Sequence, residues 1–369
     1  MYLKKTIAIT VASFALSATS VTARDITYAH FLPAAGSIRD ATVAYFDRVS
    51  KATDGELTFE TFWAGAMGGP VEMLDTIGSQ TVDAGGIVDA YLRSSIPTAS
   101  MFSDFGRLVS SNEDMLAYSA AVTEQQLLSC QECTADYENN NVKLLATTAV
   151  APYYIMCKPE VTSTADMVGK KVRAVGNPAN LMQQMGAVPV SVTTAEMYEA
   201  MQRGQADCST GSAAWLDEYK LGEFVKSMIN EPINDYISSG NILFNLDVWN
   251  DFSDAQRAAF VEELPAFVAQ INFEALSDAD KAIEAAKANG LKIYEPDDEF
   301  KTLIAEFRGG TFADAITTAE GTGVKVADRV VSDFEALVEK WSAIVTDIGM
   351  DQDAYEEALR TEIYSKLPN

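Results

Sequence analysis

Two segments of this 369-residue chain repeat one pattern, and this repeat constrains the fold more than any other feature. Residues 72–83 and 196–207 both open with Glu-Met, continue with apolar residues at helical spacing and end on an aspartate at the same offset. Each follows a short β-rich run, at residues 57–63 and 188–192, and the first runs into a strand that we expect to begin at Val82. We therefore predict two strand–helix–strand units, which would form two similar α/β lobes.

Other short apolar runs bounded by turn residues predict the remaining strands. These runs lie at residues 26–30, 142–148, 153–157, 171–175 and 242–246. Strands that alternate with helices predict mostly parallel sheets, with ligands at the carboxyl ends of the strands. From Ser253 onward the pattern changes to amphipathic helices, for the first of which Ser253 and Asp254 are candidate N-caps. We expect these helices at residues 253–285, 297–307, 324–348 and 351–366.

The N-terminus predicts export. A short basic stretch, residues 1–5, is followed by an uncharged apolar run to residue 22 and by small residues up to Ala23. This is the layout of a signal peptide over residues 1–23, and we expect the mature protein in the periplasm. The alternative is a membrane anchor, but the run is shorter than about 20 apolar residues and is diluted by Ser and Thr.

The charge balance narrows the possible partners. Twenty-seven Lys and Arg residues face 53 Asp and Glu residues, so the formal net charge is −26. A surface of this sign repels nucleic acid and anionic lipid headgroups, and we expect neither as a partner. An acidic protein of this kind can still bind an anion, but only through a local cationic group.

Four cysteines, Cys130, Cys133, Cys157 and Cys208, fit an oxidising compartment, where an even number favours disulfides. Three pairings are possible, and we favour Cys130–Cys133 with Cys157–Cys208. Free thiols remain one alternative, and a zinc half-site or redox motif at Cys130-Gln131-Glu132-Cys133 is another. A second half-site is missing from the sequence, and His30, the one histidine, is a hundred residues away. We therefore expect no metal and no cofactor.

Catalytic motifs are missing from the sequence. His30 is the one possible histidine base, and no nucleophile motif lies near it. The chain has no GxSxG, no phosphate-binding Walker loop and no HExxH. We therefore expect a binding protein rather than an enzyme.

Arg173 stands inside the short β run at residues 171–175. On the inward face of a strand an arginine needs an acidic partner or a ligand, and its fork of N–H groups matches a carboxylate. The alternative is an arginine at the strand edge in water, and the strand pattern alone favours that alternative.

Several ordered motifs resemble the substrate-binding proteins of tripartite ATP-independent periplasmic (TRAP) transporters, the DctP family. These motifs lie at residues 28–33, 53–57, 65–72, 166–173, 186–190 and 196–207. The resemblance runs from about Ile26 to Gln256. In that family two α/β lobes close around the ligand, and the arginine in the position of Arg173 forms a salt bridge with the ligand carboxylate.

The resemblance implies an α/β fold of the two-lobed periplasmic-binding-protein clamshell type, with mixed, mostly parallel sheets. It also implies a helical C-terminal region with a long helix that spans both lobes. We expect lobe I at residues 24–150 plus about 239–278. Lobe II would contain residues 151–238 plus about 279–369, with the C-terminal helices.

Candidate ligand-binding residues follow from this arrangement. They are Arg173, His30, Phe31, Glu72, Tyr91, Tyr153, Asn177, Trp215 and Asn241. Family members that bind sialic or sugar acids often carry a second arginine at a position that falls here near Pro152, and an asparagine that is missing from residues 208–212. Fewer polar anchors and more aromatic groups predict a less hydroxylated ligand, such as an aromatic or short branched monocarboxylate.

The resemblance predicts an extracytoplasmic solute-binding protein, expected to be a monomer. It would capture a small organic acid anion by hinge closure and deliver it to the small and large membrane subunits of a TRAP transporter for ion-gradient-driven uptake. One alternative is a ligand-sensing binding protein used in signalling. Another, from a different class, is an exported enzyme that uses His30 and acidic residues.

Overall fold

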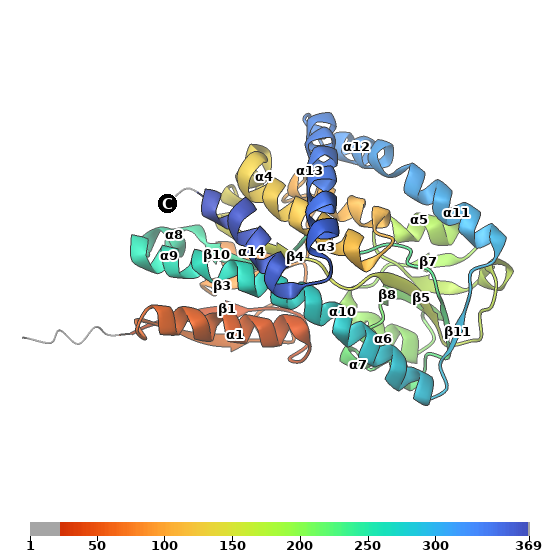
Figure 1. The fold of residues 1–369 in the computed structure, drawn as a ribbon. Coiled ribbons are helices and arrows are strands. Elements are labelled where there is room, and N and C mark those ends of the chain that lie inside the picture. Colours follow the sequence, from red (N-terminus) through yellow and green to blue (C-terminus); the bar gives the residue numbers. More distant parts are fainter. Residues whose placement is uncertain (1–22, 368–369) are drawn as a thin grey trace, which may run out of the picture.

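The computed structural model describes residues 23–367. The predicted signal peptide therefore lies outside the described residues, except for Ala23. Figure 1 shows two lobes side by side, each built around a β-sheet with helices packed on it, and a group of helices from the C-terminal part of the chain. This arrangement confirms the predicted two-lobed α/β architecture.

The first sheet has five strands in the order β2-β1-β3-β10-β4. Its strands are β1 (Arg24–Ala29), β2 (Leu57–Phe62), β3 (Ala84–Ile87), β4 (Val142–Thr148) and β10 (Ser239–Asn245). β1 runs parallel to β2 and β3, whereas β10 runs antiparallel to β3 and β4. A strand from much later in the chain therefore lies between β3 and β4.

The second sheet has six strands in the order β11-β9-β5-β8-β6-β7. Its strands are β5 (Tyr153–Cys157), β6 (Lys171–Arg173), β7 (Val188–Val190), β8 (Cys208–Ser212), β9 (Ser227–Ile229) and β11 (Lys292–Tyr294). β6 runs parallel to β7 and β8, and β9 runs parallel to β11. β5 runs antiparallel to β8 and β9, so both sheets are mixed.

Helices cover the sheets and form the C-terminal region (Figure 1). They are α1 (Ser37–Ala52), α2 (Met73–Gly78), α3 (Asn112–Glu124), α4 (Gln131–Glu138), α5 (Pro178–Gln184), α6 (Thr194–Gln202), α7 (Trp215–Glu218), α8 (Leu246–Asp251), α9 (Asp254–Glu262), α10 (Leu264–Ala288), α11 (Asp298–Gly309), α12 (Thr311–Gly321), α13 (Ala327–Ile348) and α14 (Gln352–Glu362). Two 3₁₀ segments, Asp89–Tyr91 and Ala99–Leu108, follow β3.

The repeated sequence pattern forms the same topology twice. α2 connects β2 to β3 and α6 connects β7 to β8, and the sheets have the matching orders β2-β1-β3 and β7-β6-β8. The aspartates that end the two repeats also make the same contact. Asp83 accepts a hydrogen bond from the N–H of Thr27 over 2.9 Å, and Asp207 accepts one from the N–H of Lys171 over 2.9 Å. Each carboxylate thus ties the end of its repeat to the neighbouring parallel strand.

The predicted helix at residues 253–285 is wrong as one helix, because the chain forms α9 and α10 there. Pro265 lies in the first turn of α10, where its missing N–H and fixed φ are tolerated, so a new helix begins at that point. Ser253 is the N-cap of α9, and its hydroxyl accepts a hydrogen bond from the N–H of Gln256. Asp254 is the first helical residue rather than the cap. The sequence analysis did not predict α12.

α10 spans both lobes, as predicted. It packs on α1 and β4 of the first lobe and on α7 of the second (Figure 1). The last helices pack beside it, with α13 against α3 and α14 against α10. Two chain segments cross between the lobes beneath this helix, at residues 149–152 and 230–238.

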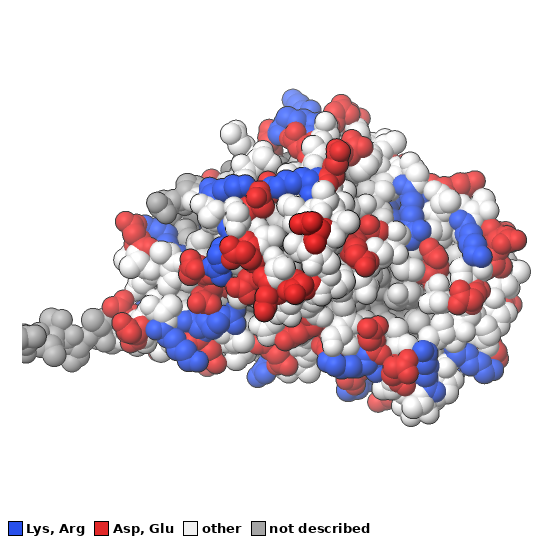
Figure 2. Space-filling model, in the orientation of Figure 1, with Lys and Arg blue, Asp and Glu red and all other residues white. Residues whose placement is uncertain are grey.

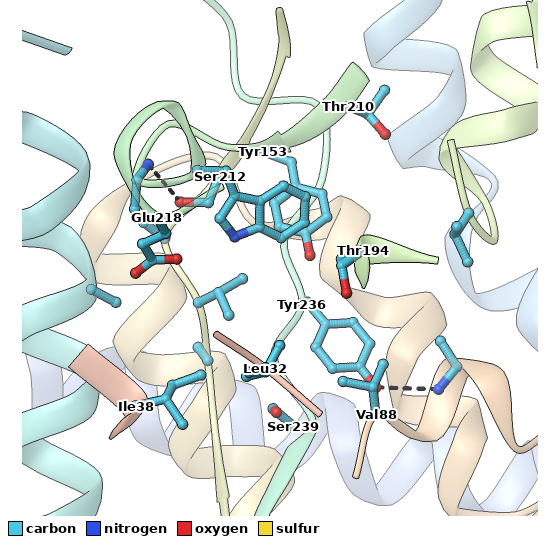
Figure 3. Close-up of a pocket in the computed structure, with 18 of the residues that line it drawn as sticks. Leu32, Ile38, Val88, Tyr153, Thr194, Thr210, Ser212, Glu218, Tyr236 and Ser239 are labelled. Carbon is cyan, nitrogen blue, oxygen red and sulfur yellow. Dashed lines mark hydrogen bonds between the residues drawn. The ribbon is translucent and has the colours of Figure 1, made fainter. Parts of the chain in front are cut away.

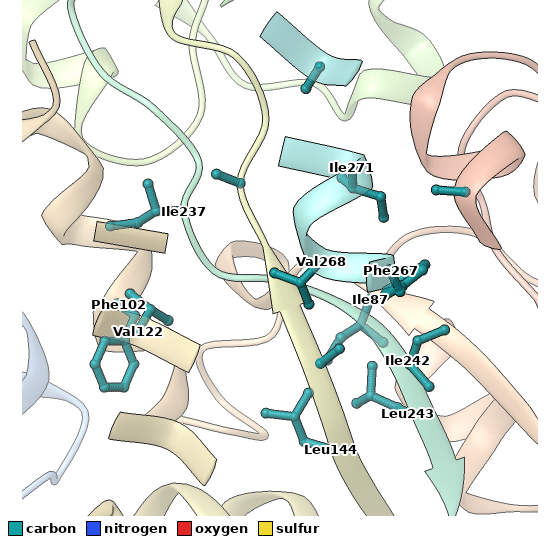
Figure 4. Close-up of a cluster of buried hydrophobic side chains, with 14 of the residues drawn as sticks. Ile87, Phe102, Val122, Leu144, Ile237, Ile242, Leu243, Phe267, Val268 and Ile271 are labelled. Carbon is teal, nitrogen blue, oxygen red and sulfur yellow. The ribbon is translucent and has the colours of Figure 1, made fainter. Parts of the chain in front are cut away.

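The core of the first lobe forms where α10 meets the sheet. Figure 4 shows Phe267, Val268 and Ile271 of α10 close to Ile242 and Leu243 of β10. All five side chains are fully buried. Burial of an aliphatic or aromatic side chain of this size contributes about 1.5–3 kcal/mol, so this contact holds α10 firmly to the first lobe.

Both predicted disulfides are present. Cys157 and Cys208 face each other on the antiparallel strands β5 and β8, and their bridge closes a sequence separation of 51 residues. Cys130 precedes α4 and pairs with Cys133 in its first turn, which makes the N-terminus of that helix rigid.

Acidic side chains dominate the surface. Figure 2 shows more Asp and Glu than Lys and Arg on the visible face, with the densest group over α14 and the nearby part of α10. No helix within residues 23–367 is long and apolar enough to cross a membrane.

Candidate ligand-binding site

A cavity lies between the two lobes and is lined by side chains from both (Figure 3). The lobes contribute tyrosines, a tryptophan and several polar groups to its wall. The polar and aromatic residues of the wall include Ser37, Tyr91, Arg93, Tyr153, Arg173, Asn177, Thr194, Thr210, Ser212, Trp215, Glu218, Tyr219, Asn234 and Tyr236.

Arg173 is the last residue of β6, so it stands at the carboxyl end of a parallel strand. Its side chain is buried, with 2 % exposure, rather than solvated. The guanidinium donates hydrogen bonds to the carbonyl oxygens of Val192 and Thr210 and to the hydroxyl of Tyr91, over 3.0, 3.4 and 3.3 Å. These partners are neutral, and no carboxylate of the described residues lies within 4.0 Å of it. A buried charge without a counterion costs several kcal/mol, so this position favours an anion.

Tyr91 joins the lobes at the cavity. It ends the short helical turn after β3 in the first lobe. Its hydroxyl accepts hydrogen bonds from Arg173 and from the N–H of Thr194, both in the second lobe, over 3.3 Å each. Tyr91 therefore connects the first lobe to the guanidinium of Arg173 at the cavity wall.

Aromatic rings form the wall beside Arg173. The indole of Trp215 lies under the guanidinium at 5.7 Å and meets the ring of Tyr153 edge-on at 5.1 Å. Gly211 on β8 makes this possible, because a Cβ there would lie 2.1 Å from two carbons of the indole. The ring of Tyr219 also meets the indole edge-on, at 5.5 Å. The wall therefore offers flat apolar surface next to one positive charge.

A second arginine lines the cavity, but its charge is neutralised within the protein. Arg93 forms an ion pair with Asp104, which is 2 % exposed. The Asp104 carboxylate also accepts a hydrogen bond from the Nδ2 of Asn177 over 2.8 Å. Because Asn177 belongs to the second lobe, Asp104 is a second bridge across the cavity.

The crossing segment places Tyr236 in the cavity wall. Its hydroxyl bonds to the carboxyl of Asp89 and accepts a hydrogen bond from the N–H of Ala90 over 3.2 Å. Burial raises the pKa of Asp89 well above its ordinary value, which favours a neutral carboxyl that can donate to or accept from the tyrosine. This contact fixes the hinge segment to the first lobe.

Glu218 ends α7 and lines the cavity one helical turn after Trp215 (Figure 3). Burial, together with the charges of Asp278 and Asp217, raises the pKa of Glu218 to about 7. A carboxyl that titrates near neutral pH inside a cavity marks a desolvated, acidic part of the wall.

Five of the predicted ligand-binding residues line this cavity: Arg173, Tyr91, Tyr153, Asn177 and Trp215. The other four do not line it. They are His30, Phe31, Glu72 and Asn241.

His30 and Asn241 are buried against each other within the first lobe. The Nε2 of His30 lies 3.3 Å from the Oδ1 of Asn241, and its ring stacks on Trp63. Burial lowers the pKa of His30 to about 4, so the ring is neutral at neutral pH. Phe31 is a buried core residue, and Glu72 is exposed at the start of α2.

The wall also contains residues that were not predicted from the sequence: Arg93, Glu218, Tyr219, Asn234 and Tyr236. Glu218 and Tyr219 follow Trp215 by three and four residues, and this helical spacing would have placed them on the same face. Asn234 and Tyr236 belong to an irregular crossing segment, for which no periodic pattern exists.

Groups of three or more His, Cys, Asp or Glu that could hold a metal ion are not found among residues 23–367. Among the described residues that line the cavity, the guanidinium of Arg173 is the positive charge that has no acidic partner and can pair with an anion. The arrangement can bind a small anion with a flat body and can exclude water from it when the lobes are closed.

Solved structures with the same fold are solute-binding proteins of TRAP transporters. One, from a marine metagenome, is specific for pyroglutamate; it is 20% identical, has a TM-score of 0.73, and the match covers 85% of this chain and 99% of that one. Another, also from a marine metagenome, is specific for aromatic acid ligands and holds 3-hydroxybenzoate. It is 20% identical with a TM-score of 0.75, and the match covers 86% of this chain and 99% of that chain.

A relative with a described ligand class is a monocarboxylate 2-oxoacid-binding periplasmic protein from a Nostoc species. It is 24% identical over 230 residues, which are 58% of this chain and 59% of that protein. The matched segment thus spans less than two thirds of that relative.

The model of the family described as bacterial extracellular solute-binding protein, family 7 (DctP), matches residues 28–307. This range contains every residue that lines the cavity, and both sheets except the first four residues of β1. The family consists of solute-binding proteins rather than enzymes. This chain belongs to the DctP family of bacterial extracellular solute-binding proteins.

Proposed function

We propose that this protein binds a small organic monocarboxylate in the cavity between its lobes and that Arg173 pairs with the ligand carboxylate. The observation that carries the proposal is the buried guanidinium of Arg173, which has neutral partners and faces the cavity. A charge-assisted pair in a desolvated site is about twice as strong as a neutral hydrogen bond. The ligand therefore supplies the counterion that the wall lacks.

The rest of the wall favours a flat or cyclic ligand body. Trp215, Tyr153 and Tyr219 surround the position next to Arg173, and rings of this kind bind planar groups by stacking and edge contacts. The described ligands of similar proteins, pyroglutamate and 3-hydroxybenzoate, are cyclic monocarboxylates. The aromatic wall and the ligands of the similar proteins both favour the same class of ligand, an aromatic or small cyclic acid.

In this proposal the protein delivers its ligand to TRAP-type membrane subunits from the periplasm, as a monomer. The signal-peptide pattern at residues 1–23 supports export. Hinge closure between a first lobe (24–150 and about 239–278) and a second lobe (151–238 and about 279–309) would hold the ligand. The C-terminal residues that form α12, α13 and α14 were expected in the second lobe, but these helices pack on Ala99–Leu108, on α3 and on α10, respectively, and so belong with the first lobe. The crossing segments beneath α10 support this division, because few other connections join the two sheets.

A thermal-shift screen of the mature protein, followed by calorimetry, tests the proposal. The panel contains pyroglutamate, 3-hydroxybenzoate, mandelate and pyruvate. A micromolar ligand at millimolar concentration raises the free energy of unfolding by about 4 kcal/mol. Arg173→Ala should lower the affinity by about a hundredfold or more while leaving the circular dichroism spectrum unchanged.

Arg203→Ala is the matched control. Arg203 lies on the surface, 70% exposed, where it pairs with Glu199. Its loss removes the same charge without touching the cavity, and binding should stay within about twofold of wild type because exposed pairs contribute little. Micromolar binding of the acid by the Arg173→Ala variant would contradict the proposal.

A further inference from the structure

The carboxyl group of Glu218 has no hydrogen-bond or ion-pair partner among the described residues, although it lines the cavity. Its backbone N–H bonds to the carbonyl of Ala214 over 3.0 Å, so the partners of this residue involve its main chain. The causes that shift its pKa are burial and two acidic neighbours, and they include no basic group. Glu218 is half-buried, and its oxygens therefore have no donor from the described part of the protein.

The first lobe comes close to this carboxyl. A Cβ at Gly36, just before α1, would lie 2.6 Å from the Oε1 of Glu218. Gly36 has a φ of 97°, a conformation that a side chain would strain, so glycine serves both the turn and the approach of Glu218. Gly36 of the first lobe thus lies against Glu218 of the second and limits the space beside its Oε1.

Basic groups nearby do not compensate the charge. Arg39 also lines the cavity, but its guanidinium pairs with Asp40 over 2.7 Å. Asp217 and Asp278 add negative potential at Glu218 and oppose its ionised form. The cavity therefore has one positive site at Arg173 and one acceptor-rich, negative site at Glu218.

We propose that Glu218 determines specificity by accepting a hydrogen bond from a hydroxyl or N–H group of the bound monocarboxylate, and that it excludes dicarboxylates. The inference rests on the proposed function, because the ligand carboxylate must first be bound by Arg173. A ligand donor would satisfy the unpaired oxygens, and hydrogen bonds to charged groups are worth about 1.5–3 kcal/mol. A second carboxylate at the same place would face the carboxyl of Glu218, and Asp217 and Asp278 would add to the negative potential there.

The preference can be measured with pairs of acids that differ by one donor. The pairs are benzoate with 3-hydroxybenzoate and cyclopentanecarboxylate with pyroglutamate, and isophthalate serves as the dicarboxylate. Dissociation constants are measured by calorimetry at pH 8, where Glu218 is mostly ionised. The donor-bearing acid should bind wild type about ten- to a hundredfold more tightly than its partner, and isophthalate should bind weakly.

Glu218→Ala should bring this ratio close to one while benzoate or cyclopentanecarboxylate still binds. Glu199→Ala is the matched control, because its side chain is 57% exposed, it lies outside the cavity wall, and its loss changes the charge by the same amount. The ratio should persist in that variant. If the circular dichroism spectrum shows that Glu218→Ala does not fold, Glu218→Gln is used in its place. This variant should bind isophthalate more tightly than wild type does.

The outcomes separate the two proposals. Equal binding of both members of a pair by wild type, or a ratio unchanged in Glu218→Ala, overturns the role of Glu218. If such binding still depends on Arg173, the monocarboxylate function stands. Failure of wild type to bind any acid of the panel overturns both.

Discussion

The guanidinium of Arg173 donates a hydrogen bond to the hydroxyl of Tyr91 over 3.3 Å, and these two residues belong to different lobes. The anion site and the closed arrangement of the lobes are thereby linked through one bond. The Tyr91 hydroxyl also accepts a hydrogen bond from the N–H of Thr194, so it is the acceptor for two donors of the second lobe. In the proposed function, a ligand that neutralises Arg173 would bind at the place where the lobes meet.

Tyr91→Phe should weaken binding of the carboxylate about three- to tenfold. The substitution removes the acceptor of Arg173 and of the Thr194 N–H, and a single hydrogen bond contributes about 0.5–1.5 kcal/mol. Calorimetry with the acid selected by the thermal-shift screen measures the change. Tyr198→Phe, which loses a hydroxyl bonded to Glu223 on the exposed surface, should bind like wild type. An unchanged dissociation constant for Tyr91→Phe would contradict this role.

Asn177→Asp should disfavour closure, because it places a carboxylate within hydrogen-bond distance of the buried Asp104. Two like charges at this separation repel, and the Arg93 guanidinium already pairs with Asp104. We expect affinity to fall by about tenfold or more, and the radius of gyration with ligand, from small-angle X-ray scattering, to stay near that of the free protein. Asn180→Asp introduces the same change at an exposed position of α5 and should close normally. A variant Asn177→Asp that closes like wild type would refute the bridge.

His30 should make folding sensitive to acid. Burial lowers its folded-state pKa to about 4, below the ordinary value of 6.5, so the unfolded chain binds the proton more tightly. The stabilisation from a neutral His30 is present above pH 6.5 and is lost as the pH falls toward 4, by about 3 kcal/mol in total. Urea unfolding of wild type and His30→Gln from pH 4 to pH 8 isolates this contribution as the difference between the two proteins. A difference that stays constant with pH would show that His30 is not buried as a neutral ring.

The two disulfides should differ in their effect on stability. In the chain-entropy description the bridge with a sequence separation of 51 contributes about 4 kcal/mol, and the one with a separation of 3 contributes about 1.5 kcal/mol. We expect the double variant Cys157→Ser with Cys208→Ser to lose more of the free energy of unfolding than Cys130→Ser with Cys133→Ser. Denaturant unfolding under non-reducing conditions compares them. Equal losses would mean that loop closure does not govern the effect.

The sequence predicts the two-lobed fold well because the repeat reflects local physics. Apolar spacing in residues 72–83 and 196–207 produces a helix between two parallel strands in each lobe, and the final aspartates repeat one contact. The split of α9 from α10 was not predicted, because the helical pattern continues through Pro265, which occupies the first turn of the second helix.

The site was predictable only in part. The strand pattern favoured a solvated Arg173, and only the resemblance placed it in the cleft. His30 follows the first strand and its side chain packs inward, and a position at a strand end does not reveal which way the ring turns. The Arg93–Asp104–Asn177 bridge depends on a contact between residues 73 positions apart, Asp104 and Asn177, which no local pattern contains.

The position of β10 also sets an order of events during biogenesis. β10 lies between β3 and β4, yet the ribosome makes it after β5–β9 of the other lobe. The N-terminal strands therefore cannot complete their sheet until residue 245 has emerged. The strands β5–β9 of the second sheet are thus all synthesised before the first sheet can close around β10.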